Sequence, residues 1–254
     1  MPKPSFFHRY ANPAEFLRLH AALLPIAVAM GLLTGMLGLY GGLVVAPADY
    51  LQGEAVRIMY IHVPAAWMST LIYAFIALAS ATFLIWRHTL AELLARQAAA
   101  IGAVFTLITL LTGMLWGKPT WGAYWVWDAR LTSMLLLFFL YLGYLGLASM
   151  APYQERTKTA CAWLAIVGAV NLPIIKFSVD WWNTLHQPAS ILRSGGPSIH
   201  SSMLVPLILM ILSFAFLFIA LLLVRAETAL KQQKLRRLQI QKIARKNAAL
   251  EEPL

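Results

Sequence analysis

Long apolar stretches without a formal charge alternate along this chain with short segments that hold its charged residues. The stretches free of Asp, Glu, Lys and Arg run over 19–48, 58–86, 97–117, 131–154, 159–175 and 194–224. A helix needs about 20 apolar residues to cross the hydrocarbon core of a bilayer. Each stretch can hold one such helix; the shortest is the fifth, where Lys176 can extend its charged end to the interface.

Turn and aromatic signals narrow these stretches to six expected transmembrane helices. They are predicted at 21–45, 64–86, 97–116, 131–150, 159–178 and 202–224. We therefore expect an all-α polytopic membrane protein, with an N-terminal arm over 1–20, a six-helix domain over 21–224 and a basic tail over 225–254. Because the number of spans is even, both termini are expected on the same side of the membrane.

The composition agrees with a membrane protein. The 254 residues are 60% hydrophobic and only 12% charged, whereas soluble domains carry roughly 25% charged residues. The single cysteine, Cys161, excludes a disulfide, a CxxC redox pair and a cysteine-based metal cluster within the chain. Much of the net charge of +10 falls in the tail, so the charge does not require a nucleic-acid partner.

The basic residues predict the orientation of the chain. All but five of the 20 Lys and Arg fall in the arm, the tail and the loops 87–96 and 151–158. The five others are Arg57, Lys118, Arg130, Lys176 and Arg193. Positive residues accumulate on the cytoplasmic side, so both termini are predicted there, and the loops 46–63, 117–130 and 179–201 are predicted outside. For the tail, a helix on anionic headgroups, a partner-binding helix and a merely solvated helix all stay open.

Two histidines of the outer loops share a sequence pattern. His62 and His186 both begin the sequence His-x-Pro-Ala. Proline favours the first turn of a helix, so each histidine is predicted just before a helix N-terminus. Imidazole is a common metal ligand and a frequent axial ligand of haem iron. An interfacial polar role is the alternative for this pair, and His200 is expected to be a loop residue beside a helix start.

The loop between the third and fourth spans is rich in tryptophan. The segment 116–132 contains four tryptophans, one acid and two bases: Trp116, Trp121, Trp125, Trp127, Asp128, Lys118 and Arg130. If 121–128 were a helix begun by Pro119, Trp121, Trp125 and Asp128 would share one face. Flat aromatic walls beside imidazoles and bases suit a planar apolar ligand with carboxylates, such as a porphyrin. An aromatic belt that anchors the loop in the headgroups is the alternative.

These segments resemble a known family of membrane proteins. The sequence WGKPTWGAYWVWDARLT over 116–132 is similar to the tryptophan-rich WWD signature of haem-handling proteins. The segments 57–66, 171–175 and 181–187 resemble the two histidine-bearing segments of the CcmC family, which handles haem in bacterial cytochrome c maturation. The resemblance covers roughly residues 10–225, and the size of six spans argues against larger relatives with the same signature, such as CcmF.

The resemblance implies a haem carrier, not an enzyme, that holds haem b transiently and without a covalent bond at the periplasmic face of the inner membrane. His62 and His186 would be the axial ligands of its iron. The platform for the ring would consist of Trp116, Trp121, Trp125, Trp127 and Asp128. Arg57, Lys118 and Arg130 are candidate contacts for the propionates, which the resemblance does not specify.

The resemblance also implies partners. These are the periplasmic haem chaperone CcmE, the small membrane protein CcmD, and the ABC transporter subunits CcmA and CcmB. The chain has no GxxxxGK[ST] phosphate loop, so ATP hydrolysis would take place in a partner. Two other classes stay open: a b-type membrane cytochrome, whose histidines normally lie inside the spans, and a transporter that moves haem across the membrane through polar spans.

Overall fold

The computed structural model describes residues 13–187, 190–191 and 195–251, with the side chains of 246–251 left aside. Three parts of the chain lie outside the described residues: the predicted arm up to residue 12, residues 188–189 and 192–194 of the third outer loop (which include Arg193), and 252–254. The helices are α2 (Pro13–Tyr40), η1 (Gly41–Val45, a π-helix), η2 (Glu54–Ile58, a 3₁₀-helix), α3 (Met59–Trp86), α4 (Thr89–Trp121), α5 (Ala129–Met150), α6 (Glu155–Gly168), α7 (Asn171–Trp181) and α8 (Ser201–Glu251).

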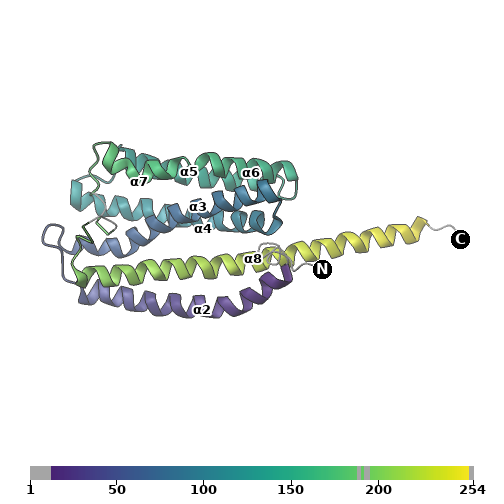
Figure 1. The fold of residues 1–254 in the computed structure, drawn as a ribbon, viewed down its shortest axis with the longest axis horizontal. Helices are drawn as coiled ribbons and strands as arrows, with labels where there is room; N and C mark the ends of the chain where they lie inside the picture. Colours follow the sequence, from purple (N-terminus) through teal and green to yellow (C-terminus); the bar gives the residue numbers. More distant parts are fainter. Residues whose placement is uncertain (1–12, 188–189, 192–194, 252–254) are drawn as a thin grey trace.

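The prediction of an all-α protein with six spans is confirmed. Six helical segments in the described part of the chain are long and apolar enough to cross a membrane. They lie side by side in an elongated bundle, in which α6 and α7 together make the fifth span (Figure 1). In pairs, α2 packs on α8, α3 on α4, and α5 on α4, α6 and α7.

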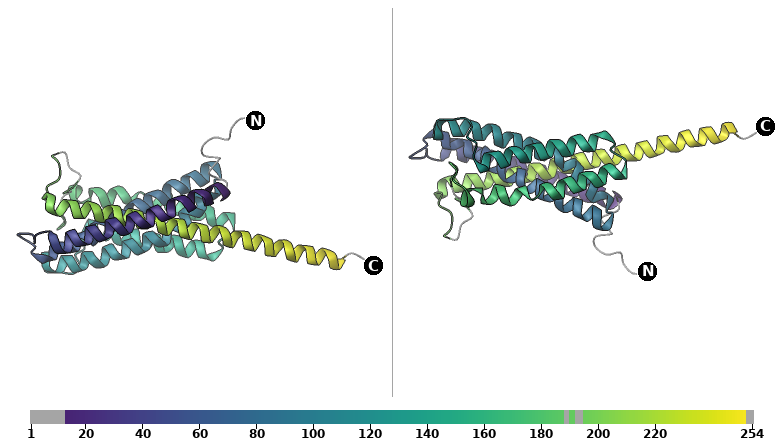
Figure 2. Two further views of the ribbon diagram at one scale, coloured as in Figure 1. Left: turned by 90° about the horizontal axis from the view of Figure 1, so that it is seen from below. Right: turned by 90° about the horizontal axis from the view of Figure 1, so that it is seen from above.

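The loops divide between the two ends of the bundle. The segments 46–53 and 122–128, and the described residues 182–187, 190–191 and 195–200, lie at one end, which we call the loop end (Figures 1 and 2). The opposite end, the tail end, holds the start of α2, and the last turns of α8 project beyond the bundle there. These three segments are shorter than the predicted outer loops, because the helices extend further than expected.

Helix α4 shows why the predicted bounds were too short. It was expected over 97–116 but runs from Thr89 to Trp121. At its start, the His88 ring accepts a hydrogen bond from the Ala91 N–H, and Glu92 pairs with Arg96 at 3.6 Å. A charge-free run measures the part of a helix that lies in hydrocarbon, whereas caps and ion pairs extend the helix beyond it.

The fifth span is interrupted, although one helix was predicted over 159–178. Helix α6 ends at Gly168 and α7 restarts at Asn171. Pro173 lacks the N–H that would bond the carbonyl of Ala169, so the hydrogen-bond ladder is weakened at this point. The Asn171 side chain lies at the break and donates to the Ser133 carbonyl at 2.8 Å, which ties the break to α5.

Helix α3 also begins earlier than predicted. The 3₁₀-helix η2 runs directly into it, so Pro64 lies inside α3 and does not start it. His62 is therefore a helical residue, and the prediction that it precedes a helix N-terminus was wrong. The missing N–H of Pro64 leaves only the Tyr60 carbonyl without its helical partner, a small loss so near a helix start.

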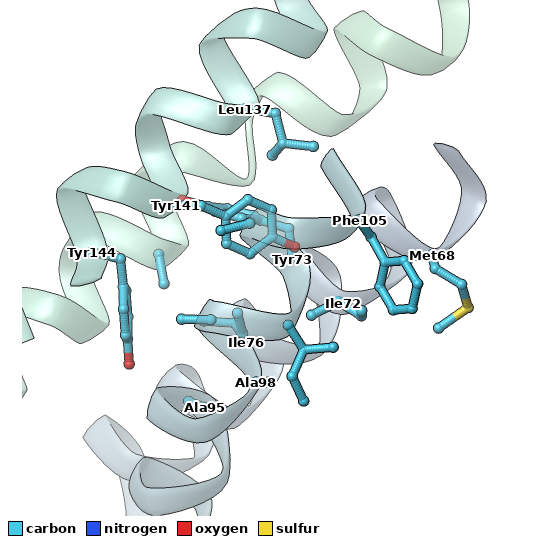
Figure 3. Packing of buried hydrophobic residues seen from close by; sticks show 14 of the residues in the cluster. Met68, Ile72, Tyr73, Ile76, Ala95, Ala98, Phe105, Leu137, Tyr141 and Tyr144 are labelled. Atoms are coloured by element: carbon cyan, nitrogen blue, oxygen red, sulfur yellow. The ribbon is translucent and has the colours of Figure 1, made fainter. Parts of the chain in front are cut away.

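The main core fixes α3 against α4 and α5 (Figure 3). Tyr141 of α5 is fully buried, donates its hydroxyl to the Ser69 carbonyl at 2.7 Å and meets the Tyr73 ring edge-on. This packing requires Gly102 of α4, because a Cβ there would lie 2.3 Å from the Tyr141 ring. The core thus sets the register of α3 and α4, whose loop ends carry the site described below.

Candidate functional site

A cavity of about 640 Å³ opens at the loop end between α3, α4, α7 and α8. Its volume lies in the range usual for ligand pockets. Five of the residues predicted for a site line it: His62, His186, Trp116, Trp121 and Arg130. Trp67 and Lys176 line it as well. The tertiary structure therefore brings together side chains that are more than 120 positions apart in the chain.

His62 is held between two helices. Its Nδ1 lies 3.0 Å from the Thr112 hydroxyl oxygen of α4. That hydroxyl already donates to the Ile108 carbonyl at 2.6 Å, so it accepts from His62, and the proton of the neutral ring lies on Nδ1. Nε2 then keeps its lone pair, which is the form of imidazole that binds a metal.

His186 lies in the irregular segment between α7 and α8, and Asp128 holds it. Its Nδ1 lies 3.3 Å from Oδ2 of Asp128, and its backbone N–H donates to the Thr184 hydroxyl at 3.1 Å. The same hydroxyl donates to Oδ2 of Asp128. A carboxylate behind a histidine fixes its tautomer and makes it a stronger metal ligand, so Nε2 of His186 is also left for a metal. No helix starts at the described residues that follow His186; the next one begins at Ser201.

Burial and hydrogen bonding set the charge states of this pair. Burial lowers the pKa of His186, although the Asp128 carboxylate acts in the opposite direction. Burial by itself would raise the pKa of Asp128, but the hydrogen bonds from the Leu131 N–H and the Thr184 hydroxyl leave that pKa lowered. At neutral pH, Asp128 is therefore a carboxylate and His186 is neutral.

Two of the four tryptophans contact the histidines. The Trp121 ring centre lies 4.8 Å from that of His186, and the Trp116 ring centre lies 5.6 Å from that of His62. The Trp116 N–H donates to the Gln52 side chain at 2.8 Å, which fixes the orientation of the indole. The cavity thus has an indole beside each imidazole.

The other two tryptophans lie elsewhere, because 121–128 is not a helix. Helix α4 includes Pro119 and ends at Trp121, where Gly122 adopts φ 79° and caps it. The chain then runs without helix to Asp128, which caps α5 through a hydrogen bond from the Leu131 N–H. Trp125 and Trp127 line a different groove, of about 360 Å³, between α4 and α5. The predicted common face of Trp121, Trp125 and Asp128 does not form.

Two of the three candidate propionate contacts also point away from the cavity. Arg57 donates to the carbonyls of Gly42 and Ala46 at 2.7 and 3.1 Å and pairs with Glu54. Lys118 donates to the Gly122 carbonyl at 3.0 Å. Arg130 does line the cavity, and no hydrogen bond or ion pair from its guanidinium to a described residue is found.

Several residues of the site were missed by the sequence analysis. Thr112 and Gly113 lie four and three residues before the predicted Trp116, on the same face of α4, and this spacing was a usable signal. A Cβ on Gly113 would lie 3.1 Å from Cε1 of His62, so glycine leaves room for the imidazole. Thr184 could have been identified only from its nearness to His186 in the sequence, and no sequence pattern indicated Gln52.

The arrangement suits an iron whose equatorial ligands come from a flat ring. Within the described residues, no three His, Cys, Asp or Glu side chains gather in a way that could hold a metal ion by themselves. Two imidazoles suffice for haem, because the macrocycle supplies the other four nitrogens. Indole rings supply apolar contact for such a ring, and Arg130 offers a cation for its carboxylates.

The two groups of tryptophans are expected to differ in function. Trp121→Ala should weaken haem binding markedly, because it removes an indole from the cavity beside His186. Trp127→Ala should leave haem binding nearly unchanged, because Trp127 is exposed and lines the other groove. A haem titration of both detergent-purified variants, with thermal unfolding as a check of folding, measures the difference; equal losses in the two variants would contradict it.

Comparisons with known proteins point to one family. The family model described as "Heme exporter protein C" (CcmC) matches residues 6–241. The chain is 49% identical to "Heme exporter protein C" of Bradyrhizobium diazoefficiens, over 92% of this chain and 89% of that protein. It is 41% identical to the protein of the same name from Escherichia coli K12, over 91% of this chain and 93% of that protein.

A eukaryotic relative extends the comparison. A "Putative cytochrome c biosynthesis ccmC-like mitochondrial protein" of Marchantia polymorpha is 55% identical, over 73% of this chain and 78% of that protein. The residues matched by the family model include every candidate site residue, the first five spans and most of the sixth. The chain therefore belongs to the heme exporter protein C (CcmC) family.

Proposed function

We propose that this chain holds haem in the cavity at the loop end, between His62 and His186, and presents it to a haem chaperone during cytochrome c maturation. The names of its relatives refer to haem export and to cytochrome c biosynthesis. The observation that carries the proposal is the pair of imidazoles in one cavity. Each Nδ1 is engaged by a protein acceptor, so that each Nε2 is left for iron.

The residues of the cavity divide the task of binding. His62 and His186 bind the iron from opposite sides, and two imidazoles leave no open position for oxygen chemistry. Trp116 and Trp121 contact the ring, and Arg130 pairs with the propionates. The chain binds haem b without a covalent bond and only transiently, because a carrier must release its cargo. It carries and presents haem and is not itself a catalytic subunit.

The orientation follows from the basic residues. The tail end carries most of the Lys and Arg, so it faces the cytoplasm, and the loop end faces the periplasm of a bacterial inner membrane. The haem site is then accessible to the periplasmic chaperone CcmE. The chain acts with CcmD and with the ABC transporter subunits CcmA and CcmB, and ATP hydrolysis takes place in that transporter.

A haem titration of the purified full-length chain tests the proposal. We expect one haem per chain with a low-spin spectrum of two axial imidazoles, and transfer of that haem to purified apo-CcmE. Binding without low-spin ligation would contradict the axial pair. A stable, stoichiometric haem that never transfers would favour a b-type cytochrome, and uptake of haem by vesicles that contain this chain alone would favour a transporter.

Arg130→Gln is expected to weaken the binding of haem but not of haem dimethyl ester, because the ester has no carboxylates to pair with a guanidinium. Lys118→Gln is the matched control, since Lys118 contacts the Gly122 carbonyl outside the cavity. Both affinities are measured by absorbance titration. If Arg130→Gln weakens the ester as much as haem, Arg130 has a structural role and no direct contact with carboxylates.

A further inference from the structure

Asp128 gathers three hydrogen bonds around one carboxylate. Oδ1 accepts from the Leu131 N–H at 2.7 Å and thereby caps α5. Oδ2 accepts from the Thr184 hydroxyl and lies 3.3 Å from Nδ1 of His186. The carboxylate is 5% exposed and does not line the cavity. It therefore reaches the cavity only through His186.

The two histidines are held in different ways. His62 and its acceptor Thr112 both belong to long helices that the main core packs together. His186 follows the end of α7 on a segment without regular structure, and its imidazole is 21% exposed. Among the described residues, this segment is tied to the start of α5 beside His186 through Asp128, which accepts from the Thr184 hydroxyl and lies 3.3 Å from Nδ1 of His186.

We propose that Asp128 and Thr184 form a latch that positions His186 for the iron, and that opening this latch releases the haem from His186 first while His62 keeps its place. The inference rests on the proposed function and adds to it a positioning pair and an order of release. His62 and its acceptor lie on two helices that are packed together, whereas His186 lies on an irregular segment. The carboxylate also makes His186 a stronger ligand while the latch is closed.

The latch requires two acceptor oxygens at position 128 and a hydroxyl at position 184. An asparagine at position 128 has one acceptor oxygen, so it can cap α5 or accept from Thr184 and His186, but not both. A valine at position 184 keeps the shape of threonine and loses the hydroxyl that joins the His186 N–H to Asp128. A serine at position 184 retains that hydroxyl.

The test compares Thr184→Val, Thr184→Ser and Asp128→Asn with wild type and with Thr132→Val. Thr132 is an exposed threonine four residues after Asp128 that lines neither cavity, so Thr132→Val is the matched control. The rate of haem loss to apomyoglobin should rise roughly 10–100-fold in Thr184→Val and Asp128→Asn, which is the usual loss of metal affinity when a residue that hydrogen-bonds a metal ligand is replaced. Their spectra should gain a high-spin fraction that added imidazole converts back to low-spin. Thr184→Ser and Thr132→Val should behave as wild type.

A second readout needs no haem. In the haem-free protein, amide exchange of the peptide 182–187 should be faster in Thr184→Val and Asp128→Asn, while exchange in α3 around His62 stays unchanged. A wild-type chain without a low-spin haem spectrum overturns the proposed function before any variant is made. A low-spin wild type, with haem loss and loop exchange unchanged in both variants, overturns the latch alone.

Discussion

His62→Ala and His186→Ala are each expected to abolish the low-spin haem spectrum, with a loss of affinity beyond the roughly 10–100-fold that changes to outer-shell partners cause. Each substitution removes one axial nitrogen, and the third imidazole of the cavity, His200, is engaged with Ser202. Absorbance spectra and haem titrations of the purified variants measure the loss. The fold should survive, because both side chains line the cavity and are only partly buried.

His200→Ala is the matched control for the ligand variants. His200 lies at the same cavity, but its Nδ1 interacts with the Ser202 hydroxyl at 2.8 Å and accepts from the Ser202 N–H at 3.3 Å, so it caps α8. As the sequence predicted, it is a loop residue beside a helix start. We expect low-spin haem to persist in His200→Ala. A low-spin spectrum that survives in both ligand variants would reject the axial assignment.

Gly113→Leu is expected to remove haem binding about as completely as loss of a ligand. A Cβ at this position lies 3.1 Å from Cε1 of His62, and the larger side chain must extend into the cavity that Gly113 lines. The imidazole cannot move aside easily, because Thr112, the neighbour of Gly113, holds its Nδ1. Gly113→Ala should have a smaller effect, since a shift of the imidazole by a few tenths of an ångström relieves the close contact with the Cβ. Haem titration ranks the two variants.

Gly146→Leu controls for the change from glycine to leucine in a helix. A Cβ on Gly146 of α5 meets no heavy atom within 4 Å, and leucine favours the helix more than glycine does. Its haem affinity should therefore equal that of wild type. If Gly113→Leu bound haem normally, the ring could not occupy the space beside His62, and the proposed position of haem would be wrong.

The six spans could be predicted because the bilayer imposes a minimum length of apolar helix. The exact bounds could not. Arg96 and Glu92 lie inside α4, where they pair with each other. Pro64 lies inside the helix that it was expected to start, and Pro119 lies inside α4 and does not start a helix over 121–128. The break at Asn171 depends on a hydrogen bond to Ser133 of α5, a contact that local sequence does not contain.

The composition of the site was more predictable than its geometry. The shared His-x-Pro-Ala pattern and the tryptophan-rich segment identified His62, His186, Trp116 and Trp121, all of which line one cavity. The same reasoning grouped Trp125 and Trp127 with them, although the chain turns at Gly122 and places those two in another groove. It also could not assign Asp128 to His186, since that contact joins the start of α5 to the segment after α7.

The sequence by itself determined the six membrane spans, the division of the loops and the residue types of the site, because hydrophobicity, charge and side-chain chemistry are local properties. Only the tertiary structure decided which indoles meet the imidazoles, which base reaches the cavity and which acceptor fixes each Nδ1. Those choices depend on the register between α3 and α4 and on the path of two irregular segments. Both are set by core packing and by hydrogen bonds between residues far apart in the chain.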